Sequence, residues 1–403
     1  MKTNSLNRRL VASPVLLADR EPGVPRVVAA RPRAKGAVAI DRRGVRFGKI
    51  VEEPAAEPLA RAAVLRKRWR AALPITLPSL LAADVRAARR EIARSLDLLD
   101  AIRDGGDFLD LLRARPFAAR LAPDFVAAGA SQDLLDEREI GKAHFDATSA
   151  GRIVGRDLFV KANWLSMYPG DGSIRLRFSF GSERLHDWSR DRRRSALAAE
   201  LAERVFPECR LVSRNARVAS RLRAIVGRGV HFPERIVYSN SPHGGAVFHH
   251  DFVGARQCGV VFAQLAGKTL WLALPKKRLA EHLAAHVREH KPERAARRLA
   301  SDPRALMDYL EESDPRLVSG TLDADPRFFR RLVGAGHGRL LRPGDVLLLP
   351  SHSIDSVAWH SIFCVGTDRS LALSFAMRAG AAAPTGLAAA PRKRAAILRE
   401  CPY

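Results

Sequence analysis

Residues 240–252 read NSPHGGAVFHHDF, and this stretch decides which fold the sequence favours. Its pattern predicts a short strand over residues 245–252 that carries His249, His250 and Asp251. Residues i and i+2 of a strand point to the same face, so His249 and Asp251 present an imidazole and a carboxylate side by side while His250 points away. The stretch therefore offers two thirds of a metal site built from two histidines and one carboxylate.

A third ligand has to come from a distant strand, and the candidates are His337, His352 and His360. His360 lies in the strand-like run AWHSIF at 358–363, shortly after the turn and strand LRPGDVLLLP at 341–350. We rank His360 first and His352 second. An isolated His-x-Asp pattern arises easily by chance in a chain with 12 histidines; here its position on a predicted strand favours a metal site.

The surrounding sequence predicts many short strands with Gly- and Pro-containing turns. They are expected at 157–168, 173–180, 232–240, 245–252, 259–265, 269–274, 338–341, 345–349, 357–365 and 370–378. The first two flank a PGDG turn and are expected to form a hairpin. This pattern favours an antiparallel jelly roll interrupted by a helical insertion at about 276–335, an α+β fold. No GxGxxG or P-loop pattern supports a parallel nucleotide-binding sheet.

Four regions are expected along the chain. Residues 1–55 are predicted to be a basic, mostly irregular arm, and residues 56–150 a helical region. Residues 151–378 are predicted to form the barrel with its insertion. The tail at 379–403 is rich in Ala, Pro and Arg and is expected to be flexible.

Composition limits the partners and the cellular compartment that we expect. The 403 residues carry a formal net charge of +25, and a basic surface attracts polyanions without regard to sequence. We therefore keep nucleic-acid contact through this surface open, although an Arg-rich composition explains the charge and no helix-turn-helix, finger or RNA-recognition motif is present. The four cysteines have no CxxC spacing and no apolar run spans a membrane, so we expect a cytoplasmic protein without membrane contact.

Four motifs in order resemble the core of the JmjC/cupin-type Fe(II)- and 2-oxoglutarate-dependent oxygenases. They are NSPHGGAVFHHDF (240–252), FAQLAGKTLWLALP (262–275), LRPGDVLLLP (341–350), and AWHSIF (358–363) followed by SLALSFAMR (370–378). The resemblance covers about 220 residues, 155–378, including the insertion. It implies a double-stranded β-helix and an Fe(II) ion held by His249, Asp251 and His360.

The resemblance also implies a cation that binds the distal carboxylate of 2-oxoglutarate. Arg369, at the start of the last strand, is one candidate, because Arg grips a carboxylate with two parallel hydrogen bonds. Lys268 is the other, one residue before the position that the family favours; a one-residue offset turns a side chain to the opposite face. Thr269 at that position can add a hydroxyl hydrogen bond. Tyr238 and Asn240 are candidate substrate-binding residues.

The resemblance implies an oxygenase that hydroxylates or demethylates an unidentified substrate, either a protein side chain or a small molecule. Two alternatives stay open. One is a metal-dependent cupin enzyme that does not use 2-oxoglutarate. The other is a basic nucleic-acid-binding protein with a non-catalytic barrel.

Overall fold

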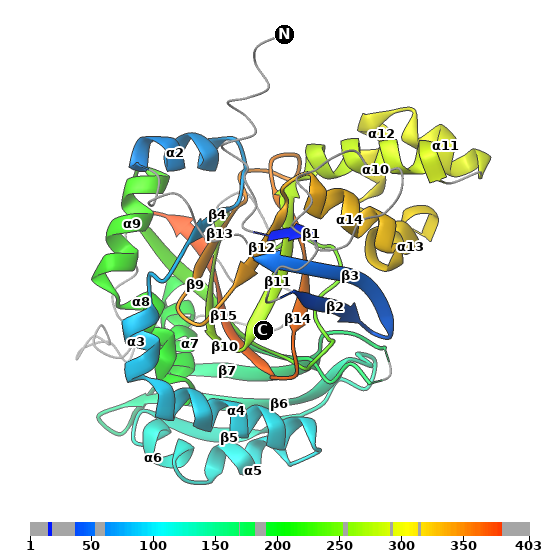
Figure 1. Ribbon diagram of the computed structural model, residues 1–403. Coiled ribbons are helices and arrows are strands. Elements are labelled where there is room, and N and C mark those ends of the chain that lie inside the picture. The colour runs from blue at the N-terminus through cyan, green and yellow to red at the C-terminus, as the bar shows by residue number, and fades with distance from the viewer. Residues whose placement is uncertain are drawn as a thin grey trace.

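The computed structural model describes residues 15–17, 37–52, 61–168, 170–181, 191–252, 257–290, 293–312 and 316–380. Within these residues the largest element is an antiparallel sheet of nine strands (Figure 1). In spatial order the strands are β4 (Ile75–Leu77), β13 (Val346–Pro350), β10 (Gln257–Ala266), β15 (Ser370–Ala379), β9 (Val230–Asn240), β8 (Ile174–Phe180), β7 (Arg152–Trp164), β6 (Glu139–Ser149) and β5 (Phe125–Ser131). The hairpin predicted around the PGDG turn is confirmed, because β7 and β8 pair.

A small sheet faces the large one. In the part of the chain that the structure describes it comprises β12 (Gly338–Leu341), β11 (Lys268–Pro275) and β14 (Ala358–Val365). Along the chain β10, β13 and β15 belong to the large sheet, whereas the intervening β11, β12 and β14 belong to the small one. Side chains of both sheets, among them Phe262, Trp271, Leu347 and Ile362, pack against one another. The two sheets thus enclose an apolar interior, and strand register decides which side chains enter it.

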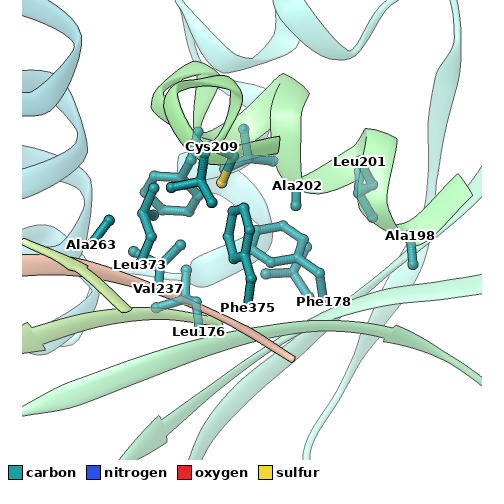
Figure 2. Close-up of a cluster of buried hydrophobic side chains, with 14 of the residues drawn as sticks. Leu176, Phe178, Ala198, Leu201, Ala202, Cys209, Val237, Ala263, Leu373 and Phe375 are labelled. Carbon is teal, nitrogen blue, oxygen red and sulfur yellow. The ribbon is translucent and has the colours of Figure 1, made fainter. Parts of the chain in front are cut away.

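Helices cover the opposite face of the large sheet. Figure 2 shows Leu201 and Ala202 of one helix beside Phe178 and Phe375 of the sheet, within a large buried apolar cluster. That helix begins at Asp191, whose carboxylate accepts a hydrogen bond from the backbone N–H of Arg194. The layer consists of α2 (Ala62–Arg70), α3 (Ala82–Ala87), α4 (Arg89–Arg103), α5 (Phe108–Arg113), α6 (Phe117–Leu121), α7 (Arg192–Val205), the 3-10 turn η1 (Pro207–Cys209), α8 (Arg210–Ser213) and α9 (Ala216–Val226).

Further helices lie between β11 and β12. They are α10 (Lys276–His290), α11 (Arg294–Ala300), α12 (Pro303–Tyr309), α13 (Arg316–Ala324) and α14 (Pro326–Gly334). Asp302 and Asp325 cap α12 and α14, and each is followed by a proline at the first helical position. Because proline lacks a backbone N–H, it starts these helices without leaving a hydrogen bond unmade.

The expectation of an irregular arm at 1–55 is wrong for the residues described there. Strands β1 (Val15–Leu17), β2 (Val38–Arg42) and β3 (Val45–Glu52) form a separate sheet in the order β1-β3-β2. Phe47 of β3 is buried against Phe329 and Phe363, at centroid distances of 5.3 and 5.0 Å. Burial of this ring outweighs the polar, basic composition that favoured disorder. Residues 1–14, 18–36 and 53–60 lie outside the described residues, as does the expected flexible tail from 381 onward.

The expected helical region at 56–150 also differs in part from the structure. Its helices end at Leu121, after which β5 and β6 extend the large sheet. The sequence of β5, FVAAGAS, is rich in alanine, which favours helix. Pairing with β6 overrides that preference, because sheet context largely decides β propensity. Among the described residues no helix is both long and apolar enough to span a membrane.

Candidate metal centre

His249, Asp251 and His360 meet at one end of the two facing sheets. Each offers one ligand atom, and these three atoms lie within 4.8 Å of one another. Asp251 Oδ1 lies 3.7 Å from His249 Nε2, and Asp251 Oδ2 lies 3.6 Å from His360 Nε2. The structure therefore brings together the three residues that the sequence ranked first as metal ligands.

The backbone fixes the two imidazoles beside each other. The expected strand at 245–252 is reduced to a single bridge, in which His249 and His360 exchange backbone hydrogen bonds of 3.0 and 2.9 Å. Because the two residues are direct cross-strand partners, their rings lie on the same side, with centroids 4.2 Å apart. A full strand is therefore not required to place the ligands.

Both rings present Nε2 toward Asp251. His249 Nδ1 lies 2.8 Å from the Val247 carbonyl oxygen, which favours the tautomer that has its proton on Nδ1 and the lone pair on Nε2. His360 is 2% exposed and stacks on Trp271, with ring centroids 5.2 Å apart. Burial, and then the nearby charge of His249, lowers the pKa of His360 to about 3. A neutral imidazole is the form that binds a metal ion.

A buried arginine of the N-terminal sheet holds the ligand segment in place. Arg42 donates from Nη1 to the Ala246 carbonyl at 2.9 Å and to Ser361 Oγ at 2.6 Å. Its Nη2 donates to the Asp323 carbonyl, and Asp323 Oδ1 accepts from the Phe248 backbone N–H at 2.8 Å. Arg42 thereby ties the segment before His249 to β14 and α13. This role was not expected from the sequence, because Arg42 falls in the segment predicted to be an irregular arm.

The helical insertion contacts the same segment from the other side. His250 Nε2 lies 2.8 Å from Glu311 Oε2, and Lys276 Nζ lies 2.5 Å from Glu311 Oε1. The ring of His250 also packs edge-on against Trp359, with centroids 5.2 Å apart. His250 is thus engaged with the insertion and does not join the ligand group, as the strand alternation predicted.

The two candidate substrate residues lie at different depths. Tyr238 is buried between the sheets, where burial and the charge of Asp251 raise the pKa of its phenol. Asn240 lies two residues further along β9, where its Nδ2 donates to Ser370 Oγ at 3.0 Å. Ser370 begins β15, at the end of the sheet remote from the metal group, so Asn240 does not face that group.

Among the three residues expected to hold the co-substrate, only Thr269 is fully buried. Thr269 donates to Gln264 Oε1 at 2.8 Å and accepts from Trp271 Nε1 at 3.0 Å. Lys268 is exposed at the start of β11, five residues before the position opposite His360. Arg369 is ion-paired with Asp100 of α4. We call this remote end of the sheets, with Asn240, Lys268 and Arg369, the far end.

His352, the second choice for the third ligand, lies outside the group. Its Nε2 is 2.8 Å from the Trp69 carbonyl oxygen, and its ring packs edge-on against the Trp69 indole. His337, the remaining candidate, contacts His282 of α10, with 3.0 Å between the two Nε2 atoms. Both histidines are therefore engaged elsewhere.

Arg339 is a buried cation that sequence analysis did not single out. It lies on β12 opposite Trp271, is 4% exposed, and donates from Nη1 to the carbonyls of Ala273 and His337. Among the described residues no carboxylate is paired with it. Burial, and then the charge of Arg68, lowers the pKa of Arg339 to about 9. Its position two strands from His360 corresponds to about 10 Å across the small sheet. An arginine inside the short apolar strand GRLL was the signal.

No protein-family model matches the sequence, and no curated protein matches it. Among solved structures, an oxidoreductase of the 2OG-Fe(II) oxygenase family from Burkholderia pseudomallei is 10% identical with a TM-score of 0.29, covering 81% of this chain and 95% of that one. A Pseudomonas putida prolyl-4-hydroxylase is 11% identical with a TM-score of 0.27, covering 80% and 100%. A ribosomal oxygenase from Escherichia coli is 11% identical with a TM-score of 0.21, covering 66% and 44%. Scores this low do not establish a shared fold, so the site is interpreted from its own geometry.

Proposed function

We propose that this chain is an Fe(II)- and 2-oxoglutarate-dependent oxygenase. The observation that carries the proposal is the convergence of His249, Asp251 and His360, with one ligand atom from each inside 4.8 Å. Two histidines and one carboxylate on one face of an octahedral ion leave positions open, which is typical of non-haem iron oxygenases. The alternation of β10 to β15 between two facing sheets supports a double-stranded β-helix, a jelly roll.

The donor set fits a divalent iron. Both imidazoles direct Nε2 toward Asp251; a backbone carbonyl engages Nδ1 of His249, and burial opposes protonation of His360. Asp251 supplies the anionic oxygen and is partly exposed, so a ligand can approach from solvent. Such hydrogen bonds behind the ligands fix ring orientation and strengthen metal binding.

We assign the distal carboxylate of 2-oxoglutarate to Arg339, in place of Arg369 or Lys268. A buried guanidinium without a carboxylate partner is costly, and an incoming carboxylate removes that cost. Arg369 already has Asp100 as its counter-ion, and Lys268 is solvated. Tyr238, buried on the facing sheet, is placed to line the same interior. A buried cation with no carboxylate partner among the described residues also favours an enzyme that uses 2-oxoglutarate over a cupin that does not.

The overall reaction consumes dioxygen and 2-oxoglutarate. One oxygen atom enters the carboxylate of succinate as CO2 leaves, and the other is inserted into a substrate C–H bond as a hydroxyl. Bound Fe(II) supplies the activation of dioxygen. The chain's own residues hold the ligands, orient 2-oxoglutarate through Arg339, and exclude water with the apolar side chains around Trp271. On an N-methyl group the same insertion gives a carbinolamine, which loses formaldehyde, so demethylation is the same chemistry.

The test is release of succinate from 2-oxoglutarate by the full chain with Fe(II) and ascorbate. We expect slow release without substrate and its loss in His249→Ala. His352→Ala is the matched control, since it removes a histidine at the same end that is not in the group. Full activity in His249→Ala, or none in the wild-type protein after iron loading, contradicts the proposal. Stabilisation by 2-oxoglutarate in the presence of Mn²⁺, seen as a higher Tm, separates this enzyme from a cupin that does not bind it.

A further inference from the structure

A cavity of ≈ 690 Å³ opens between α7, α9 and the strands β9, β10 and β15. Its lining includes Gln257 and Cys258, the first residues of β10. The side-chain amide of Gln257 donates to the backbone carbonyl of Asp251 at 2.8 Å. The cavity and the candidate metal group therefore share a wall at one end of the large sheet.

The lining of this cavity is strongly basic. Two glutamates, Glu200 and Glu203, face a larger number of guanidinium groups. The arginines are Arg192, Arg214, Arg223, Arg228, Arg235 and Arg378. A concave surface with this excess of one charge sign concentrates oppositely charged ligands, because its low-dielectric walls focus the electrostatic field.

Buried Glu203 and Arg235 form the floor of the cavity, and Glu203 is also the counter-ion of the exposed Arg214. Glu203 is 4% exposed and is ion-paired with Arg214 at 2.7 Å and with Arg235 at 3.2 Å. Arg210, outside the lining, is 3.5 Å from the same carboxylate. Arg235 is 7% exposed, and its Nε has no hydrogen-bond partner among the described residues. The single carboxylate of Glu203 therefore does not neutralise these arginines, and the floor of the cavity keeps a net positive charge.

The rim carries further positive charge. Arg192, Arg223 and Arg228 are exposed, and no carboxylate among the described residues is paired with them. The charge of Arg228 reaches the start of β10, where it acts on the Cys258 thiol. A ligand in the cavity therefore meets guanidinium groups from floor and rim together.

The size and lining of the cavity favour a small ligand over a nucleic acid. Its volume falls within the range of about 300–1,000 Å³ typical of small-molecule sites. Phe232 is the only Phe, Tyr or Trp among the described lining residues, so successive bases have no rings to stack on. Guanidinium groups bind phosphate and carboxylate oxygens in the same two-pronged geometry.

We propose that this arginine-lined cavity binds the anionic part of the substrate, a small molecule with at least two phosphate or carboxylate groups. The reacting carbon then extends past Gln257 toward His249, Asp251 and His360. The anion site stands by itself, whereas its role as a substrate site rests on the proposed oxygenase function.

The first test measures anion binding to the full chain without metal. Pyrophosphate and tricarballylate are titrated by calorimetry in EDTA, so the result does not depend on iron. We expect at least one of them to bind, and the doubly substituted Arg223→Gln/Arg228→Gln protein to bind it at least tenfold more weakly. The matched control is Arg294→Gln/Arg298→Gln, which removes two exposed arginines of α11, far from the cavity (Figure 1).

The comparison of the two probes identifies the anion. Tighter binding of pyrophosphate indicates phosphate, and tighter binding of tricarballylate indicates carboxylate. Absence of binding by both probes overturns the proposal, as does an equal loss in the α11 control. Binding of single-stranded RNA that depends on Arg223 and Arg228, without binding of either small anion, also overturns it in favour of a nucleic-acid surface.

The second test asks whether the bound anion is substrate. A deproteinised cell extract is divided on an anion-exchange resin, and each fraction is added to the iron-loaded protein with 2-oxoglutarate. We expect the retained fraction to raise succinate release severalfold in the wild-type and α11 control proteins but not in Arg223→Gln/Arg228→Gln. Stimulation by the unretained fraction alone, or by neither, overturns the substrate role. If the protein has no basal succinate release but still binds the anion, the oxygenase proposal fails and the anion site remains.

Discussion

Charged side chains have different partners and different exposure at the metal end and at the far end of the two facing sheets. At the far end, Arg369 has Asp100 as its counter-ion and Lys268 is exposed to water. Toward the metal end, Arg339 is buried with no carboxylate partner among the described residues, and His360 is buried in its neutral form. A buried charged group that has no counter-ion in the folded protein is stabilised when a ligand supplies one. The difference shows that the partners of a cation, more than its residue type, decide whether it can serve a site.

The largest effect is expected from the metal end itself. His360→Ala removes one of the three ligand groups and should lower affinity for Mn²⁺ or Co²⁺ by at least about 100-fold. Calorimetric titration of the metal-free protein measures this. His352→Ala should leave affinity within twofold, because His352 contacts Trp69 instead. Comparable losses in both variants would show that the metal binds elsewhere.

Separate substitution of Arg339 and of Arg369 by methionine tests this comparison most directly. Arg339→Met should weaken 2-oxoglutarate binding by about 30-fold, because a buried hydrogen-bonded charge pair contributes roughly 2 kcal/mol or more. Arg369→Met should change it less than twofold. The KM for 2-oxoglutarate in succinate release is the measurement. A larger change in KM for Arg369→Met than for Arg339→Met would indicate that 2-oxoglutarate binds at the far end. It would contradict the assignment of Arg339.

Arg42 tests whether the N-terminal sheet supports the metal end. Arg42→Ala removes the guanidinium that pairs with the Asp323 carboxylate and donates to the Asp323 and Ala246 carbonyls, so the free energy of unfolding should fall by about 2 kcal/mol. Arg46→Ala, which breaks an exposed pair with Asp41 on the same sheet, should leave the free energy of unfolding nearly unchanged. Urea unfolding of both variants measures the difference. Equal losses of stability in the two variants would mean that Arg42 on β2 does not hold the segment before His249 in place.

The smallest expected effect is a dependence of stability on pH. The pKa of His360 is about 3 in the folded protein and near 6.5 when unfolded, so below pH 6.5 the unfolded chain takes up a proton that the folded chain does not. Stability should therefore fall as pH falls, by about 1 kcal/mol between pH 6.5 and 5.5 from this group. His360→Asn should remove that share of the slope in metal-free protein, measured by urea unfolding. An unchanged slope would show that His360 is not buried as a neutral ring.

Local sequence patterns were sufficient for the strand that carries His360, whereas the strand expected for His249 and Asp251 is only a single bridge. Alternation and turn residues predicted the β7–β8 hairpin, and the strands that hold His360 and Arg339 were expected within a residue or two of their observed bounds. His249 and Asp251 were placed together by their spacing alone. Patterns of this kind succeed because side-chain direction follows from backbone geometry over a few residues.

The pairing of distant segments was decided only by the tertiary structure. The sequence ranked His360 ahead of His352 and His337, but it could not show the bridge between His249 and His360, which joins positions 111 residues apart. In the sequence Arg42 and Arg339 resembled ordinary basic residues. In the structure both donate to backbone carbonyls, but Arg42 is paired with Asp323, whereas Arg339 has no carboxylate partner in the part of the chain that the structure describes. The sequence determines the residue types, whereas their burial and their partners are determined when the two sheets pack together. The tertiary structure therefore decides what each charged residue can do, because the free energy of a charge depends on its surroundings.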